Sequence, residues 1–185
     1  PYKALNYAKA LVKMYDSMAN VTIYNKVAAR LRLGENFFYV GSLQHALEEE
    51  RKAYRMAMKA GDSNLLSYVR QNLASTFEEM GEKDSCLYYA RLAYDLNAAN
   101  RFSCLLTFAS AYISVDSLNQ AFSLLNQALP KTAEDRYSVF YFQSQAAMKA
   151  QDFKSAKSFS DSAYHYLEDM YRTALQGKAA YYTSF

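Results

Sequence analysis

The 185-residue chain contains little proline, glycine or cysteine, with two, five and two residues respectively. Average proteins contain about 5% proline and 7% glycine, so a collagen-like chain, long loops and a turn-rich β-sandwich are disfavoured. Two cysteines, Cys86 and Cys104, do not make a disulfide scaffold. No apolar run approaches the roughly 18 residues of a membrane span, and no signal-peptide pattern opens the chain. The low proline and glycine contents favour an all-helical chain.

Charge of either sign is not concentrated in any part of the chain. The 21 basic and 18 acidic residues give a net charge of +3, and the two signs are interleaved. Because nucleic-acid binding normally requires a basic stripe, we expect no direct nucleic-acid binding by this segment. The hydrophobic content of 51% is enough for a continuous core and argues against a disordered chain.

The first and last residues do not look like natural termini. The chain begins at Pro1 without a methionine and stops at Phe185 without a tail. We therefore expect a piece of a longer protein, with any targeting segment or membrane tether outside it.

Apolar residues recur with helical spacing along the whole chain. The pattern predicts helices over residues 1–19, 21–39, 43–60, 63–80, 86–93, 105–112, 118–128, 139–147, 153–163 and 170–185. Turns are expected at Gly41, Gly61, Gly81, Asp116 and Gln151. Asp62 is the predicted N-cap of the helix that follows Gly61. Pro130 is expected to end the helix 118–128, since proline cannot donate the next backbone hydrogen bond. Gly34 lies inside a predicted helix, so we expect a neighbouring helix to approach closely there.

Small residues recur in the second helix of each predicted pair. The first small residue of each unit is Ala46, Cys86, Ala121 and Ala156 in turn, at intervals of 40, 35 and 35 residues. The second, seven residues further on, is Ala53, Ala93, Ala128 and Ala163. Seven residues span two helical turns, so both side chains lie on one face and allow another helix to pack closely. This periodicity indicates a stacked array of helix pairs.

The pattern resembles the tetratricopeptide repeat (TPR), a helix pair of about 34 residues with the motif W-x2-L-G-x2-Y, then A-x3-F, then P. The L-G-x2-Y element is represented by Leu33-Gly34 with Phe37, Leu73-Ala74 with Phe77, and Phe108-Ala109 with Tyr112, and in degenerate form by Gln143-Ser144 with Ala147. The chain departs from the motif at Arg30 and Arg70, which replace Trp, and at Ala98 and Ala133, which replace Pro. Glu50 stands where a large apolar residue is expected.

The resemblance covers roughly residues 20–167 and implies an all-α fold, a right-handed superhelical α-solenoid of TPR-like helix-turn-helix pairs. We expect the whole chain, 1–185, to form one such solenoid. Its expected parts are an N-terminal helix or half-repeat at 1–19, repeats at 20–60, 61–97, 98–132 and 133–168, and a C-terminal capping helix at 169–185.

A narrower resemblance is to TPR sensor segments of membrane-tethered bacterial transcriptional regulators. Its carriers are the 40-residue interval, the 18 tyrosines, and the phrases Tyr15-Asp16-Ser17 and Ser160-Asp161-Ser162-Ala163. It implies a periplasmic segment that senses a signal, followed by a membrane helix and a cytoplasmic DNA-binding or kinase portion. A cytoplasmic location is the alternative.

In the TPR family the first helix of each pair lines a concave groove that binds a peptide or a partner protein. The resemblance places sixteen residues of this chain at groove positions: Arg32, Glu35, Tyr39, Tyr68, Gln71, Asn72, Ser75, Glu78, Glu79, Leu106, Ser110, Ile113, Tyr141, Gln145, Met148 and Lys149. They combine amides, hydroxyls, aromatic rings and an acidic stretch, which suits an extended peptide. The family's clamp for a C-terminal carboxylate is not evident, since only Asn72 offers a part of it.

Two other functions are open on the sequence alone. Tyr68 and Tyr141 could stack on a ligand in a small-molecule or glycan receptor, and the terminal helices could mediate self-association. Catalysis is disfavoured, because His45 and Glu48 alone do not make a metal site and no catalytic constellation or phosphate-binding loop is evident. We therefore expect a non-catalytic binding module without a metal or other cofactor, the sensing or scaffolding part of a larger regulator.

Overall fold

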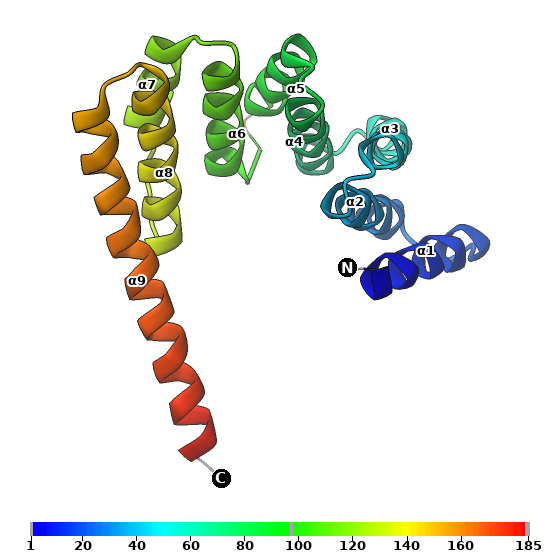
Figure 1. Ribbon diagram of the computed structural model, residues 1–185. Helices are drawn as coiled ribbons and strands as arrows, with labels where there is room; N and C mark the ends of the chain where they lie inside the picture. Colours follow the sequence, from blue (N-terminus) through cyan, green and yellow to red (C-terminus); the bar gives the residue numbers. More distant parts are fainter. Residues whose placement is uncertain (1, 97, 184–185) are drawn as a thin grey trace. The chain divides into compact units, whose positions relative to one another are not determined.

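The fold consists of α-helices joined by short connections. The computed structural model describes the backbone of residues 2–96 and 98–183, and the side chains of residues 2–96 and 98–176. In those residues it contains no β-strand, which confirms the all-α prediction. The helices are α1 Tyr2–Ser17, α2 Ile23–Tyr39, α3 Leu43–Ala60, α4 Ser63–Glu79, α5 Lys83–Tyr94, α6 Arg101–Ser114, α7 Leu118–Asn126, α8 Ala133–Lys149 and α9 Phe153–Thr183 (Figure 1). None of the described helices is both long enough and apolar enough to cross a lipid bilayer.

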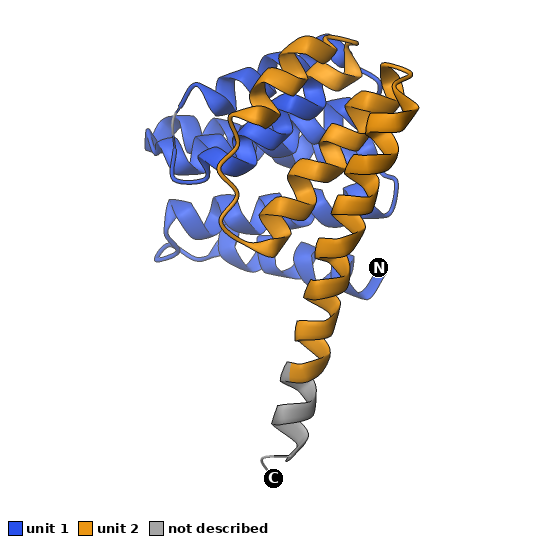
Figure 2. Cartoon of the chain, turned by 90° about the vertical axis from the view of Figure 1, so that its left-hand side faces the viewer, with its two compact units in different colours: residues 1–111 blue, residues 112–185 orange. Residues whose placement is uncertain are grey.

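The chain divides into two compact units, residues 1–111 and residues 112–185 (Figure 2). The first holds α1 to α5 and most of α6, and the second holds the end of α6 together with α7, α8 and α9. The expected single right-handed superhelix over 1–185, with its repeat boundaries, stays a prediction. Pro1 and Phe185, the first residue of the first predicted helix and the last residue of the last one, lie outside the described residues.

The turns between paired helices share one backbone geometry. Gly41, Gly81, Asp116 and Gln151 have positive φ angles of 75°, 76°, 61° and 60°. The residue after each donates its amide to a carbonyl five residues earlier, at 2.9 Å, in the pairs Ser42 to Phe37, Glu82 to Phe77, Ser117 to Tyr112 and Asp152 to Ala147. This left-handed residue with a long backward hydrogen bond is the Schellman motif. The four turns repeat with the spacing of the small residues, so the predicted turns are confirmed.

Only two of these four turns have glycine at the left-handed position. Replacing a glycine there and introducing one should therefore change the free energy of unfolding in opposite directions. An alanine Cβ at Gly81 would meet no atom within 4 Å, so Gly81→Ala tests the backbone conformation alone. We expect Gly81→Ala to lower the free energy of unfolding by about 1 kcal/mol, and Gln151→Gly to raise it by about the same amount. Urea denaturation measures both changes. If both substitutions changed the free energy of unfolding in the same direction, the left-handed conformation at positions 81 and 151 would be contradicted.

The small residues of the repeat lie in the helix interfaces. The side chains of Ala46, Ala53, Cys86, Ala93, Ala121, Ala156 and Ala163 are all buried. Ala128 is the exception, since it is half-buried and lies beyond the end of α7 at Asn126. The helix therefore ends before Pro130, as predicted, but two residues earlier than its predicted end at residue 128. Because the residue before a proline avoids helical geometry, the chain leaves the helix upstream of Pro130, with Gln127 and Ala128 bonded in tighter turns.

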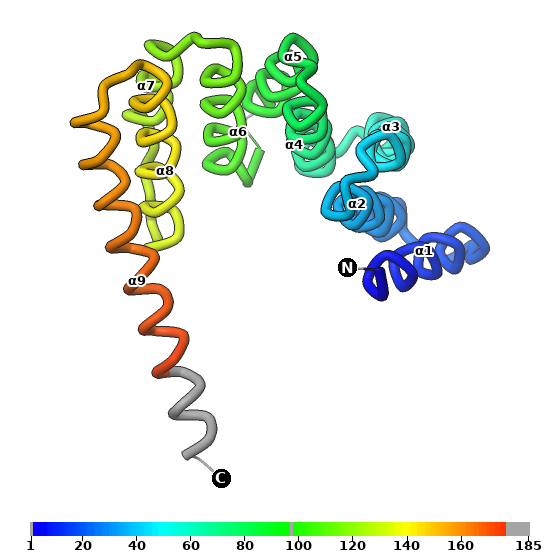
Figure 3. The backbone as a smooth tube through the Cα atoms, in the orientation of Figure 1, coloured from blue at the N-terminus to red at the C-terminus, as the bar shows by residue number. Residues whose placement is uncertain are grey.

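The predicted break between the helices 153–163 and 170–185 is absent, because α9 runs unbroken from Phe153 to Thr183. Ion pairs one turn apart follow its surface, with Lys157 and Asp161 at 2.8 Å and Arg172 and Glu168 at 3.6 Å. Tyr166 stacks on Phe140 of α8 with ring centroids 5.8 Å apart. These contacts, with no proline or glycine between 153 and 176, favour one helix. Its described part continues past the N-terminal end of α8 (Figure 3).

The departures from the TPR motif are accommodated by charged contacts between helices. Arg30 donates to Asp16 of α1 at 2.6 Å and to Glu49 of α3 at 2.7 Å. Arg70 donates to the carbonyl of Leu92 at 2.9 Å. Two arginines thus replace the packing of tryptophan by hydrogen bonds that join separate helices.

Gly34 lies where α2 and α3 approach closely, as predicted. An alanine Cβ there would be 3.2 Å from Cγ of Glu50 and 3.4 Å from the carbonyl oxygen of Ala46. The absence of a side chain at Gly34 therefore makes room for Glu50, whose side chain is only 1% exposed.

Candidate binding groove

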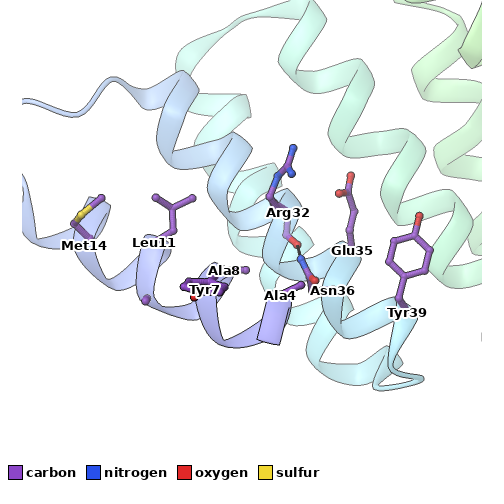
Figure 4. A pocket seen from close by; sticks show the side chains of 10 residues that line it. Ala4, Tyr7, Ala8, Leu11, Met14, Arg32, Glu35, Asn36 and Tyr39 are labelled. Carbon is purple, nitrogen blue, oxygen red and sulfur yellow. Dashed lines mark hydrogen bonds between the residues drawn. The ribbon is translucent and has the colours of Figure 1, made fainter. Parts of the chain in front are cut away.

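The predicted groove residues of the first two repeats lie on one face of each of their helices. Arg32, Glu35 and Tyr39 are three and four residues apart on α2, and Figure 4 shows their side chains projecting from the same side of it. On α4 the corresponding residues follow one another at spacings of four and three: Tyr68, Asn72 and Ser75.

The N-cap of α4 fixes where that helix begins. The Asp62 carboxylate accepts hydrogen bonds from the amides of Asn64 at 2.8 Å and Leu65 at 3.0 Å. The predicted cap is therefore confirmed, and it sets the register of the α4 groove residues.

Three hollows adjoin on this face. The largest, about 740 Å³, lies between α1 and α2 (Figure 4). A hollow of about 200 Å³ lies between α2 and α4, and another of about 280 Å³ also contains a residue of α3, Glu50. Glu35 lines all three, Arg32 and Tyr39 line two each, and Asn72 lines the two smaller ones. We call these three hollows, which share lining residues, the α2–α4 groove.

Helix α1 supplies groove residues that the sequence analysis did not identify. Tyr7 and Met14 line the largest hollow and are 78% and 48% exposed. They lie seven residues apart, so they share a face of α1 beside its buried residues. That spacing of exposed apolar residues is the signal by which the sequence could have indicated them.

Glu50 is the buried carboxyl group of the groove. The hydroxyl of Thr76 donates to its Oε1 at 2.8 Å. Among the residues that the structure describes, its other oxygen, Oε2, has no hydrogen-bond partner. Burial raises the pKa of Glu50 from 4.5 to about 7; the Thr76 hydrogen bond opposes this rise, and the charge of Glu35 adds to it. The residue that departs from the TPR motif is thus poised to titrate near neutral pH.

Other predicted groove residues of the first unit join α4 to α6. Gln71 is buried and accepts a hydrogen bond from Ser103 at 2.6 Å. Glu78 accepts one from Ser110 at 2.8 Å. The remaining members are placed as follows: Glu79 is exposed on α4, and Leu106 is half-buried on α6. Gln71 and Glu78 therefore fix neighbouring helices in addition to any role in binding.

The predicted groove residues of the fourth repeat lie on α8, in the second unit. Tyr141, Gln145 and Met148 are exposed there. Lys149 lies 3.0 Å from Asp116 and donates to the carbonyl of Ile113 at 2.6 Å. Lys149 thereby ties α8 to the segment before α7.

His45 makes local contacts. Its Nδ1 lies 2.8 Å from the hydroxyl oxygen of Ser42, and its ring stacks on Phe37. In the described part of the chain, no group of three or more His, Cys, Asp or Glu side chains is arranged to hold a metal ion.

No protein-family model matches the chain, and no curated protein matches it. Solved structures do. A variant form of TPR-like repeats named for a kinesin light chain of Podosopora anserina is 14% identical, with a TM-score of 0.71 over 92% of this chain and 88% of that one. A second structure of such repeats from the same organism is also 14% identical, with a TM-score of 0.68 over 91% of this chain and 88% of that one. BtubC (BKLC) from P. vanneervenii is 16% identical, with a TM-score of 0.73 over 91% and 74%.

These likenesses concern the arrangement of helices, since the sequence identities are low. They agree with the recurring turns and the buried small residues of this chain. The chain therefore has the all-α fold of TPR-like helical repeats.

Proposed function

We propose that this chain is a non-catalytic module that binds an extended segment of a partner protein in the α2–α4 groove. The observation that carries the proposal is that groove residues of two successive repeats line adjoining hollows on one face. The lining of the largest hollow is mostly apolar, with Ala4, Ala8, Leu11 and Met14 from α1. It suits an apolar side chain of the bound segment.

Side chains along the groove are held in place before any partner arrives. The Asn72 amide donates to the carbonyl of Tyr68 at 3.0 Å, and the Asn36 amide donates to that of Arg32 at 2.7 Å, the bond drawn in Figure 4. Ordered amides reduce the entropy lost on binding. A preformed groove supports binding with small backbone shifts.

We further propose that the module is the scaffolding or sensing part of a larger bacterial regulator. The support for this step is the resemblance carried by the Tyr15-Asp16-Ser17 and Ser160-Asp161-Ser162-Ala163 phrases. It implies a membrane tether outside the segment and a periplasmic location.

The binding proposal is tested with Tyr7→Ala and a control on the same helix. Tyr7 and Tyr2 are 78% and 72% exposed on α1, and only Tyr7 is among the groove residues described above. We expect Tyr7→Ala to weaken binding of a selected peptide about tenfold, since aromatic anchors dominate such interfaces. We expect Tyr2→Ala to leave it unchanged.

The measurement is fluorescence anisotropy with peptides selected from an array of random 12-residue sequences. If no peptide binds, or if the two variants behave alike, the peptide proposal fails. A glycan or metabolite that raises the melting temperature, in the absence of any peptide binding, would instead favour the small-molecule receptor. A volume of about 740 Å³ is within the range of such sites.

A further inference from the structure

The hollow of about 280 Å³ has a buried acid on its wall. Phe38 and Tyr39 of α2, Glu50 of α3, and Asn72 and Thr76 of α4 line it. We call it the Glu50 pocket. Its volume is just below the range of drug-sized ligand sites, so it suits a single side chain or a small ion with an alkyl stem.

The Glu50 carboxyl group is incompletely satisfied. Its side chain is 1% exposed and lines the pocket, and Thr76 satisfies Oε1. Oε2 has no hydrogen-bond partner in the part of the chain that the structure describes. Leaving a buried acceptor unpaired is unfavourable, so a donor supplied by a ligand in the pocket would stabilise the folded chain.

The pocket favours a positively charged donor. Glu35 is a second carboxylate on its wall, and none of the described residues that line it is lysine or arginine. Phe38 and Tyr39 also line it, and aromatic rings attract cations through cation–π interaction. Two carboxylates fall short of the six to eight oxygen ligands of a calcium site.

We propose that the Glu50 pocket binds an alkylammonium group, the side chain of a lysine in the partner segment. This inference rests on the proposed binding of a partner in the α2–α4 groove. The buried Oε2 of Glu50 turns toward the pocket on binding. The ammonium N–H groups then donate to it and to Glu35, and the alkyl stem packs against Phe38 and Tyr39.

The charge state of Glu50 couples this binding to pH. Burial raises the pKa of Glu50 to about 7, so the carboxyl is partly protonated at neutral pH. The ionisable groups around it are Glu35 and Tyr39 of α2, while Thr76 and Asn72 of α4 are neutral. A bound ammonium ion favours the carboxylate, and the proton of Glu50 passes to the buffer.

The experiment uses two variants that each remove one negative charge from α3. Glu50→Gln keeps an oxygen that accepts from Thr76, so we expect it to fold. Glu48→Gln is the matched control, since Glu48 is exposed two residues away. The probes are Nα-acetyl-lysine methylamide, its Nε-acetylated neutral form, and 1,5-diaminopentane, each titrated by calorimetry at pH 7 in two buffers of different ionisation enthalpy.

We expect the lysine probe to bind to the wild type and to Glu48→Gln with release of up to one proton. We expect binding to Glu50→Gln to be at least tenfold weaker, and the neutral probe to bind at least tenfold more weakly than the lysine probe. Equal binding by Glu50→Gln, or equal binding of the neutral probe, would overturn the inference. Binding of the diamine without the lysine probe would assign the pocket to a free diamine and overturn the peptide source.

Failure here can be told apart from failure of the proposed function. Tyr7 is not among the residues that line the Glu50 pocket. Peptide binding that is lost in Tyr7→Ala and unchanged in Glu50→Gln would keep the groove and remove the lysine site. Binding of the lysine probe without any peptide binding would keep the lysine site and remove the proposed peptide groove.

Discussion

Replacing Glu50 by glutamine is expected to stabilise the protein above neutral pH and to remove part of the pH dependence of its stability. The pKa of Glu50 is about 7 in the folded protein and near its ordinary value of 4.5 in the unfolded chain. Between these values the folded state binds more protons, so the free energy of unfolding falls as pH rises from about 4.5 to about 7. The loss is complete above pH 7 and amounts to about 3 kcal/mol, at 1.36 kcal/mol for each pKa unit.

The free energy of unfolding of the Glu50→Gln variant should therefore be about 3 kcal/mol higher than that of the wild type at pH 8. At pH 4.5 the two values should be nearly equal. Urea denaturation at several pH values measures the difference, and Glu48→Gln provides the control for loss of one charge on α3. A parallel pH profile for wild type and Glu50→Gln would show that Glu50 does not titrate in this range.

The other shifted groups act outside this window. Hydrogen bonds lower the pKa values of Asp135 and Asp152, so these carboxyls titrate below 3.8. Burial raises the pKa values of Tyr89 and Cys104, so these groups titrate above 9. The slope between pH 4.5 and 7 that disappears in Glu50→Gln therefore reports on Glu50.

Local sequence signals predicted the helices and their turns well. The glycines at 41 and 81 require no tertiary information, since a left-handed residue after an apolar helix is a local stop. Asp116 and Gln151 are weaker local signals, since neither residue adopts a positive φ as readily as glycine. The continuity of α9 was missed because the chain was divided after the last repeat, although apolar residues continue at helical spacing from Ala163 through Leu167 to Met170 and no residue there breaks the helix.

The site was less predictable because it depends on how helices pack. Asn72 and Gln71 are neighbours in the sequence, yet Asn72 lines the groove and Gln71 is buried against α6. A rotation of 100° per residue separates them, and a small error in helix phase exchanges their roles. Glu50 could be identified as a departure from the motif, but its unpaired oxygen follows only from the contacts of α2, α3 and α4.

The second large effect is expected from filling the space beside a small residue of the repeat. The side chain of Ala93 on α5 is fully buried, and leucine would add three carbon atoms to a helix interface without room for them. We expect Ala93→Leu to lower the free energy of unfolding by about 3 kcal/mol, the upper part of the usual range for overpacking. In a chain of this length that corresponds to a fall in melting temperature of roughly 6–12 °C.

Ala128→Leu provides the matched control, because Ala128 holds the same place in the next repeat unit but lies beyond α7 and is half-buried. We expect this variant to change the free energy of unfolding by less than about 1 kcal/mol, since the added atoms can turn toward water. Leucine and alanine differ little in helix propensity, so packing dominates the comparison. Calorimetric melting of both variants decides the matter: equal losses would mean that the seven-residue spacing of small side chains does not specify where these helices touch.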